Sequence, residues 1–262
     1  GLTSAGISAL SPYFQACNKK GGATIVLAND RHRSTRAGFF ATAGLSALGM
    51  VVSMPRESRA AAPAGAHPSA QAVLEQLLAG NRRYASDTAV NCLRNYDRRA
   101  EVAGGQNPFA IILTCSDSRV GPEAIFDQGI GNLFVVRVAG NIADSAGIGT
   151  IEYAIDHFHS PLLVVMGHSE CGAVSATLSL LESKGKAPGH IATLVDAIEP
   201  AARSVLGKPG DTLDNAVRAN VAHVVATLKR ESSIIAQAAA TGALQVVGAH
   251  YSLSDGSAQV LA

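Results

Sequence analysis

A chain of 262 residues, 47% of them hydrophobic, is long and apolar enough to bury a core, which excludes a disordered protein. Its 21 Lys and Arg against 20 Asp and Glu leave a net charge of +1, so nucleic acid and acidic surfaces are not expected as partners. The four cysteines are too few for a disulfide framework in a chain of this length.

Residues 1–66 differ in composition from the rest of the chain. Three arginines between positions 31 and 36 precede the uncharged stretch Ala37–Met54, and a run of alanines follows. This order is typical of a secretory signal peptide that is cleaved near Ala62 or Ala66. We therefore expect a periplasmic or secreted protein whose mature chain has no stable membrane insertion. The alternative is an N-terminal arm on a cytoplasmic protein.

The domain that follows, residues 67–262, begins with a predicted helix. Ser69 can cap this helix, which is expected to end near Gly80 and Asn81. It places four aliphatic side chains on one face: Val73, Leu74, Leu77 and Leu78. We expect this segment to form an N-terminal helical arm.

The remainder of the chain alternates predicted strands with predicted helices. Short apolar runs typical of buried strands are Phe109–Thr114, Leu133–Val138, Leu162–Met166 and Leu244–Val247. Helical spacing occurs over Ile148–Phe158, Ala173–Glu182, Ile191–Val205 and Leu213–Ala239. Strands separated by helices predict an α/β fold with a mostly parallel central sheet and flanking helices. Within Tyr251–Leu261, Asp255 and Gly256 predict a turn into a C-terminal antiparallel edge strand.

Two polar clusters begin where predicted strands end. Cys115 directly follows one strand, and His168 and Cys171 follow another. Because ligands collect at the carboxyl ends of parallel strands, we expect these three side chains to converge. Two thiolates and one imidazole suit Zn²⁺, and three protein ligands leave a fourth position open, as in catalytic zinc sites.

Other interpretations of these cysteines remain open. A cysteine at the end of a strand is often a small buried apolar residue. A closed structural zinc site would need a fourth ligand, for which Cys92 is the candidate, and Cys17 has no assigned role. A redox pair is disfavoured because the sequence has no Cys-x-x-Cys.

Charged and amide side chains near Cys115 are candidates for catalysis and substrate binding. Asp117 and Arg119 are two residues apart, so an extended segment would point both the same way and allow a charge-assisted pair. Beside a metal, such a carboxylate could orient an oxygen through a hydrogen bond, or could itself bind the metal if the arginine released it. Gln106 could donate to an oxygen of a small polar substrate.

Together these motifs resemble the β-class carbonic anhydrases. The resemblance rests on Gln106–Val120, on Phe134–Arg137 followed by Gly140 and Asn141, on Glu152–Ala154, and on Gly167–Gly172. It runs from about Leu78 to the C-terminus and is most specific in Cys-Ser-Asp-Ser-Arg followed by His-x-x-Cys. It does not cover the N-terminal segment.

The resemblance implies a role for each matching residue. Zinc would be bound by Cys115, His168 and Cys171, and Asp117 and Arg119 would form a catalytic pair. Substrate would be bound by Gln106, Phe134, Tyr153 and Gly172, with the two aromatic residues acting across a dimer interface. A glutamine at position 106 resembles the plant-like subtype of the family, which lacks an inhibitory bicarbonate site. A homodimer or a tetramer of dimers is therefore expected.

The implied activity is that of a zinc lyase, the reversible hydration of carbon dioxide to bicarbonate and a proton. Two thiolate ligands should keep the pKa of an activated water higher than three imidazoles would, so activity should rise above neutral pH. The alternatives are hydrolysis of carbon disulfide or carbonyl sulfide at the same site and a noncatalytic zinc-binding scaffold. The presence of both Asp117 and Arg119 argues against the scaffold, which would not need them.

Overall fold

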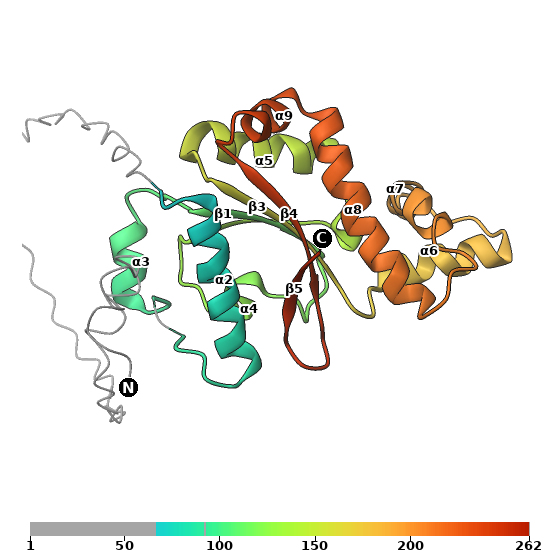
Figure 1. Cartoon of the computed structure of the whole chain (residues 1–262), viewed down its shortest axis with the longest axis horizontal. Coiled ribbons are helices and arrows are strands. Elements are labelled where there is room, and N and C mark those ends of the chain that lie inside the picture. Colours follow the sequence, from blue (N-terminus) through green and yellow to red (C-terminus); the bar gives the residue numbers. More distant parts are fainter. Residues whose placement is uncertain (1–66, 92, 262) are drawn as a thin grey trace, which may run out of the picture. The chain divides into compact units, whose positions relative to one another are not determined.

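A computed structural model describes residues 67–91 and 93–261, in which five strands form one sheet in the order β2-β1-β3-β4-β5 (Figure 1). The strands are β1 Ala110–Thr114, β2 Leu133–Arg137, β3 Leu162–His168, β4 Gln245–Tyr251 and β5 Ala258–Leu261. The first four are parallel and β5 is antiparallel to β4. This confirms the predicted mostly parallel α/β sheet with its antiparallel edge strand.

The neighbouring strands β1 and β3 are buried along their whole length because helices cover both of their faces. Every residue of β1 and of β3 is buried. Ile112 and Val164 point into one core cluster, whereas Ile111 and Leu163 point into the other. Continuous burial explains why these strands appear in the sequence as uninterrupted apolar runs.

Helices on each face complete the two clusters. On one face lie α2 (Ala70–Ala85), capped by Ser69 as predicted, and the short α4 (Pro122–Ile125). On the other lie α5 (Ser145–Phe158), α8 (Thr212–Glu231) and α9 (Ser233–Ala240). The sequence did not predict α4 or α3 (Tyr96–Val102). Among the described helices, none combines the length and apolar character needed to cross a membrane.

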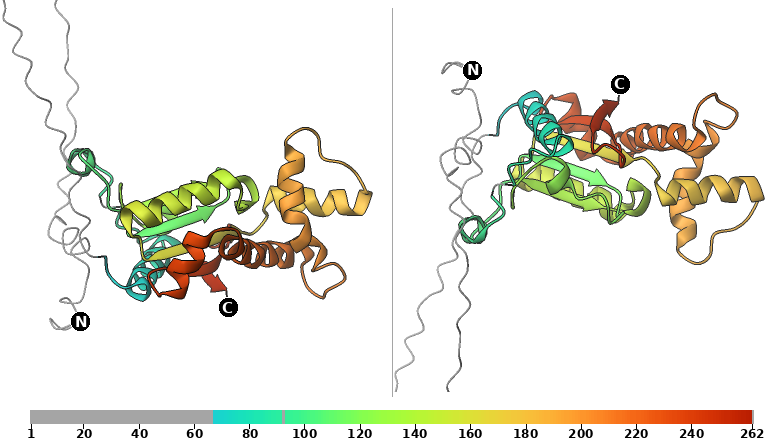
Figure 2. Two further views of the ribbon diagram at one scale, coloured as in Figure 1. Left: turned by 90° about the horizontal axis from the view of Figure 1, so that it is seen from above. Right: turned by 90° about the horizontal axis from the view of Figure 1, so that it is seen from below.

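A third cluster lies beyond the carboxyl ends of the strands. It includes Cys115 and Cys171 and packs against α6 (Gly172–Ser183), α7 (Ile191–Arg203) and the start of α8. Figure 2 shows α6 and α7, in yellow to orange, beyond the end of the sheet. This end of the sheet is where the predicted ligands collect.

One predicted helix is wrong: the span Leu213–Ala239 forms two helices. The break is at Ser232, whose backbone is extended (φ −116°, ψ 114°) and whose side chain caps α9 by accepting from the Ile235 amide. The hydroxyl also donates to Glu152 on α5 at 2.6 Å. A partner 80 residues away therefore contributes to this break, and local helical spacing does not reveal such a partner.

The predictions for the N-terminal segment and for Cys92 lie outside the described residues. These are the signal-like segment 1–66, including Cys17, and the possible fourth ligand Cys92.

Candidate metal centre

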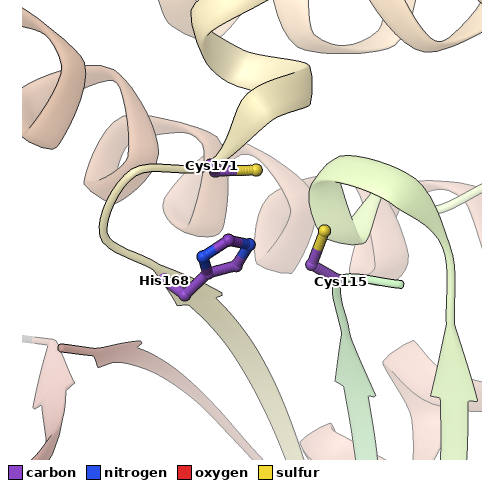
Figure 3. A group of neighbouring side chains, drawn as sticks. All are labelled: Cys115, His168 and Cys171. Atoms are coloured by element: carbon purple, nitrogen blue, oxygen red, sulfur yellow. The ribbon is translucent and has the colours of Figure 1, made fainter. Parts of the chain in front are cut away.

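Cys115, His168 and Cys171 converge at the carboxyl ends of two adjacent strands. Cys115 follows β1, His168 ends β3, and β1 and β3 are paired neighbours. Cys171 is the N-cap of α6. All three residues are buried and their ligand atoms lie within 4.8 Å of one another, with the side chains directed toward a common point (Figure 3).

The histidine is prepared to act as a metal ligand. Its Nδ1 lies 2.8 Å from the Ser169 carbonyl oxygen, an arrangement that places the proton on Nδ1 in the neutral ring. Its Nε2 is buried and has no hydrogen-bond partner among the described residues. Because a buried polar atom without a partner is costly, an ion between His168 and the two sulfurs would supply the missing interaction. Two thiolates and an imidazole are a donor set that fits Zn²⁺.

The protein favours a thiolate at Cys115. Hydrogen bonding from Cys171, and a further hydrogen bond from the Gly140 amide, lower the pKa of Cys115 to about 4. The Gly140 nitrogen lies 3.3 Å from the Cys115 sulfur. The hydrogen bond to Cys115 and burial raise the pKa of Cys171. Binding of a metal ion would release a proton from this thiol.

Asp117 and Arg119 form the predicted pair within a turn and not within an extended segment. Asp117 Oδ1 accepts from the Arg119 backbone amide and from Nε, both at 2.9 Å, and Oδ2 accepts from Nη2 at 2.7 Å. These hydrogen bonds hold the pKa of Asp117 far below its usual value. Asp117 Oδ2 is also 3.9 Å from His168 Nε2, so the carboxylate lies beside the ligand cluster while it is bound to Arg119.

Arg137, at the end of β2, anchors the loop that carries Cys115 and Asp117. Its Nε donates to the Cys115 carbonyl at 3.1 Å and its Nη2 to the Asp117 carbonyl at 2.6 Å. The sequence predicted no role for this arginine. Two signals pointed to it: its place in the Phe134–Arg137 motif and its position at the carboxyl end of a strand next to β1.

Three of the four expected substrate residues lie away from the ligands within this chain. Phe134 pairs with Ile111, four residues before Cys115, a separation of ~13 Å along a strand. Tyr153 lies beside Phe134, with ring centroids 6.3 Å apart. Gln106 is exposed and precedes β1, whereas Cys115 follows it. Only Gly172, the first residue of α6, adjoins the ligands, and in the described part of the chain no atom beyond its own neighbours and helix backbone lies within 4 Å of the position that its Cβ would occupy.

This geometry defines a class of protein: an α/β sheet with an open thiolate–imidazole zinc site at its carboxyl edge. A sequence model of the carbonic anhydrase family matches residues 110–258. Carbonic anhydrase 2 of Mycobacterium tuberculosis is 40% identical over 189 residues, which cover 71% of this chain and 90% of that protein. The chain therefore belongs to the carbonic anhydrase family.

Solved structures identify the branch of this family. A β-carbonic anhydrase from Coccomyxa, solved in complex with acetazolamide, matches with a TM-score of 0.57 and 29% identity over 72% of this chain and 86% of that one. One of two tetrameric β-carbonic anhydrases from Sordaria macrospora matches with a TM-score of 0.56 and 26% identity, covering 72% and 97%. The chain thus has the β-class fold, whose members are zinc enzymes.

Proposed function

We propose that this chain catalyses the reversible hydration of carbon dioxide to bicarbonate and a proton, with zinc bound by Cys115, His168 and Cys171. The observation that carries the proposal is the convergence of three buried ligand atoms within 4.8 Å, beside a carboxylate fixed by an arginine. Three ligands leave room for a reacting molecule, which a closed structural site does not. Membership of the carbonic anhydrase family supports the same activity.

The charged pair gives the site its selectivity in this proposal. Zinc, when bound, supplies a Lewis acid that lowers the pKa of a water molecule toward about 7 and so makes a nucleophile available. Asp117, as a carboxylate, can only accept hydrogen bonds, so it orients a hydroxyl group and disfavours anions that have no proton to donate. Arg119 keeps this carboxylate turned away from the metal position.

A pocket that is open to solvent lies on the Arg119 side of this pair. It encloses about 510 Å³, and Arg119, Ser169 and Glu170 line the wall nearest the ligands. His250 and Arg218 line the pocket as well. Water and bicarbonate are small and polar enough to enter such a pocket.

We further propose that the functional unit is at least a homodimer, in which Gln106, Phe134 and Tyr153 complete the pocket of the neighbouring subunit. Their distance from the ligands within one chain supports this proposal, since none of the three adjoins its own Cys115. The exposed side chain of Tyr153 also supports it. The matched enzymes from Sordaria macrospora are tetrameric.

Stopped-flow measurement of carbon dioxide hydration by the full, zinc-loaded chain, from about pH 6.5 to about pH 9, tests the activity. We expect fast turnover that rises with pH, and loss of both turnover and zinc in Cys115→Ser. Cys92→Ser is the matched control and should keep both; its loss of zinc would indicate a closed four-ligand site. One zinc bound per chain without turnover would contradict the proposal and favour the sulfur substrates or a scaffold.

We also propose that residues 1–66 direct export of the catalytic domain. The order of basic, uncharged and alanine-rich stretches supports this proposal. N-terminal sequencing of the protein recovered from cell fractions tests it. A mature N-terminus near Ala62 or Ala66 in the exported fraction is expected, and an uncleaved chain confined to the cytoplasm would contradict it.

A further inference from the structure

The side chain of Asn220 links helix α8 to the loop that contacts Cys115. Asn220 is 1% exposed, and its Nδ2 donates to the Gly140 carbonyl oxygen at 2.8 Å. The amide of the same glycine donates to the Cys115 sulfur at 3.3 Å. A single residue, Gly140, therefore separates a buried amide side chain on α8 from a proposed metal ligand.

Two glycines make this approach possible. A Cβ on Gly167 would lie 2.7 Å from Val221 Cγ2 and 3.0 Å from Val217 Cγ1, so α8 packs closely on β3 only because that Cβ is missing. Gly140 has φ +70°, and a Cβ there would lie 2.6 Å from Ile198 Cδ1. The loop conformation thus requires glycine at position 140. Because glycine has no Cβ, its backbone dihedral angles are less restricted than those of other residues, so the orientation of its peptide groups depends on outside contacts.

The hydrogen bonding of Asn220 indicates that this side chain has a role beyond stabilising the fold. Its Oδ1 is buried and has no hydrogen-bond partner in the described structure. The reverse orientation of the amide would place this oxygen against the Gly140 oxygen, so the contact with Gly140 fixes the orientation. A buried asparagine with one unpaired atom costs free energy that an apolar side chain of similar size would not.

We propose that Asn220 is a positioning residue that holds the Gly140 amide against the Cys115 thiolate and so tunes that sulfur as a metal ligand. This inference rests on the proposed zinc site. Because Asn220 fixes the carbonyl on one side of the Gly140 Cα, it restricts rotation of the amide on the other side. An N–H donor at a ligating sulfur withdraws charge from it and fixes its direction.

Asn220→Leu tests the inference with cobalt in place of zinc. Loss of the hydrogen bond to sulfur should move the thiolate-to-cobalt charge-transfer absorption to lower energy. Zinc affinity, measured by competition with a chromophoric chelator, should fall about tenfold, the low end of the usual effect of such supporting residues. Asn220→Asp has nearly the same shape but cannot donate when ionised, and it should change both quantities in the same direction.

Asn81→Leu is the matched control. Asn81 is a buried asparagine on α2 whose Nδ2 donates to the Ile125 and Gly256 carbonyls, remote from Cys115 in the fold. This variant should lose stability to urea while keeping the cobalt spectrum and zinc affinity of the wild type. A purely structural role for Asn220 predicts the same pattern for Asn220→Leu, and that result would overturn the inference.

The wild-type protein provides a test that does not depend on the folding of a variant. With cadmium-113 at the site, we expect scalar coupling between the metal nucleus and the Gly140 amide proton, transmitted through the hydrogen bond to sulfur. Absence of this coupling would overturn the inference. Absence of any thiolate-to-cobalt absorption in the wild type would instead contradict the proposed zinc site itself.

Discussion

At Asp117, three donors of one arginine bind a single carboxylate. The backbone amide, Nε and Nη2 of Arg119 all donate to Asp117. These bonds keep the pKa of Asp117 far below its usual value, so it is ionised throughout the range of a hydration assay. The expected rise of activity with pH must therefore come from another group.

Replacing Arg119 with alanine should release this carboxylate. Asp117 Oδ2 is already 3.9 Å from His168 Nε2, so a freed carboxylate can turn toward the metal position and block it. We expect carbon dioxide hydration to fall about 100-fold while zinc remains bound. Stopped-flow rates and metal content, measured on the same sample, check this.

The control for that variant is Arg230→Ala. Arg230 pairs with Glu231 on the exposed surface of α8, with both side chains more than half exposed. Removing an arginine there should leave rate and zinc content unchanged, because exposed pairs contribute little. A wild-type rate in Arg119→Ala would show that the pair has no gating role.

At the scale of elements, α2 is fixed by a close backbone contact with the end of α4 as well as by apolar packing in the core. Val73 and Leu77 of α2 are fully buried in the core. Gly80 of the same helix lies against the backbone of Phe126, and a Cβ at Gly80 would lie 2.7 Å from the Phe126 carbonyl carbon and closer still to its oxygen. Glycine is thus needed where the predicted helix was expected to end.

Gly80→Ala should therefore destabilise the protein by about 3 kcal/mol, because backbone atoms cannot move aside as a flexible side chain can. The control is Gly149→Ala in the exposed part of α5, where the added Cβ would meet no described atom within 4 Å outside its own neighbours and helix backbone. That variant should gain about 0.5–1 kcal/mol from the better helix propensity of alanine. Urea unfolding of both variants checks the opposite signs, and equal effects would contradict the packing described for α2.

At the scale of the whole molecule, the proposed homodimer depends on a partly exposed aromatic cluster. Tyr153 is 47% exposed and stacks on His157 with the two ring centroids 4.0 Å apart. Its ring also adjoins those of Phe134 and Phe158. Exposed aromatic side chains of this kind are common at the centres of protein interfaces. The same residues are those expected to contact substrate.

Tyr153→Asp should shift the protein toward monomers and lower its hydration rate, because a charge would be buried in the interface that completes the pocket. Sedimentation velocity over a range of concentrations, with activity measured on the same samples, checks this. Tyr96→Asp, at an exposed tyrosine on α3 outside the aromatic cluster, should change neither quantity. A fully active wild-type monomer would contradict the proposal.

The sequence by itself determined the fold class and the positions of the proposed ligands. Strands buried on both faces must be continuous apolar runs, so β1 and β3 are visible without a structure. The carboxyl ends of neighbouring parallel strands meet at one edge, so residues that directly follow these runs, such as Cys115, were expected at one site. The order of residues along the chain was sufficient to predict the ligands, because each ligand lies within three residues of a strand end.

Only the tertiary structure decided which residues support those ligands. The contact between Asn220 and Gly140 spans 80 positions in the sequence, and the bond from Arg137 to the Cys115 carbonyl spans 22. The break at Ser232 likewise involves Glu152, 80 residues away. Sequence periodicity reports which face of an element is buried but not which distant element covers it, so these contacts become visible only once the elements are packed together.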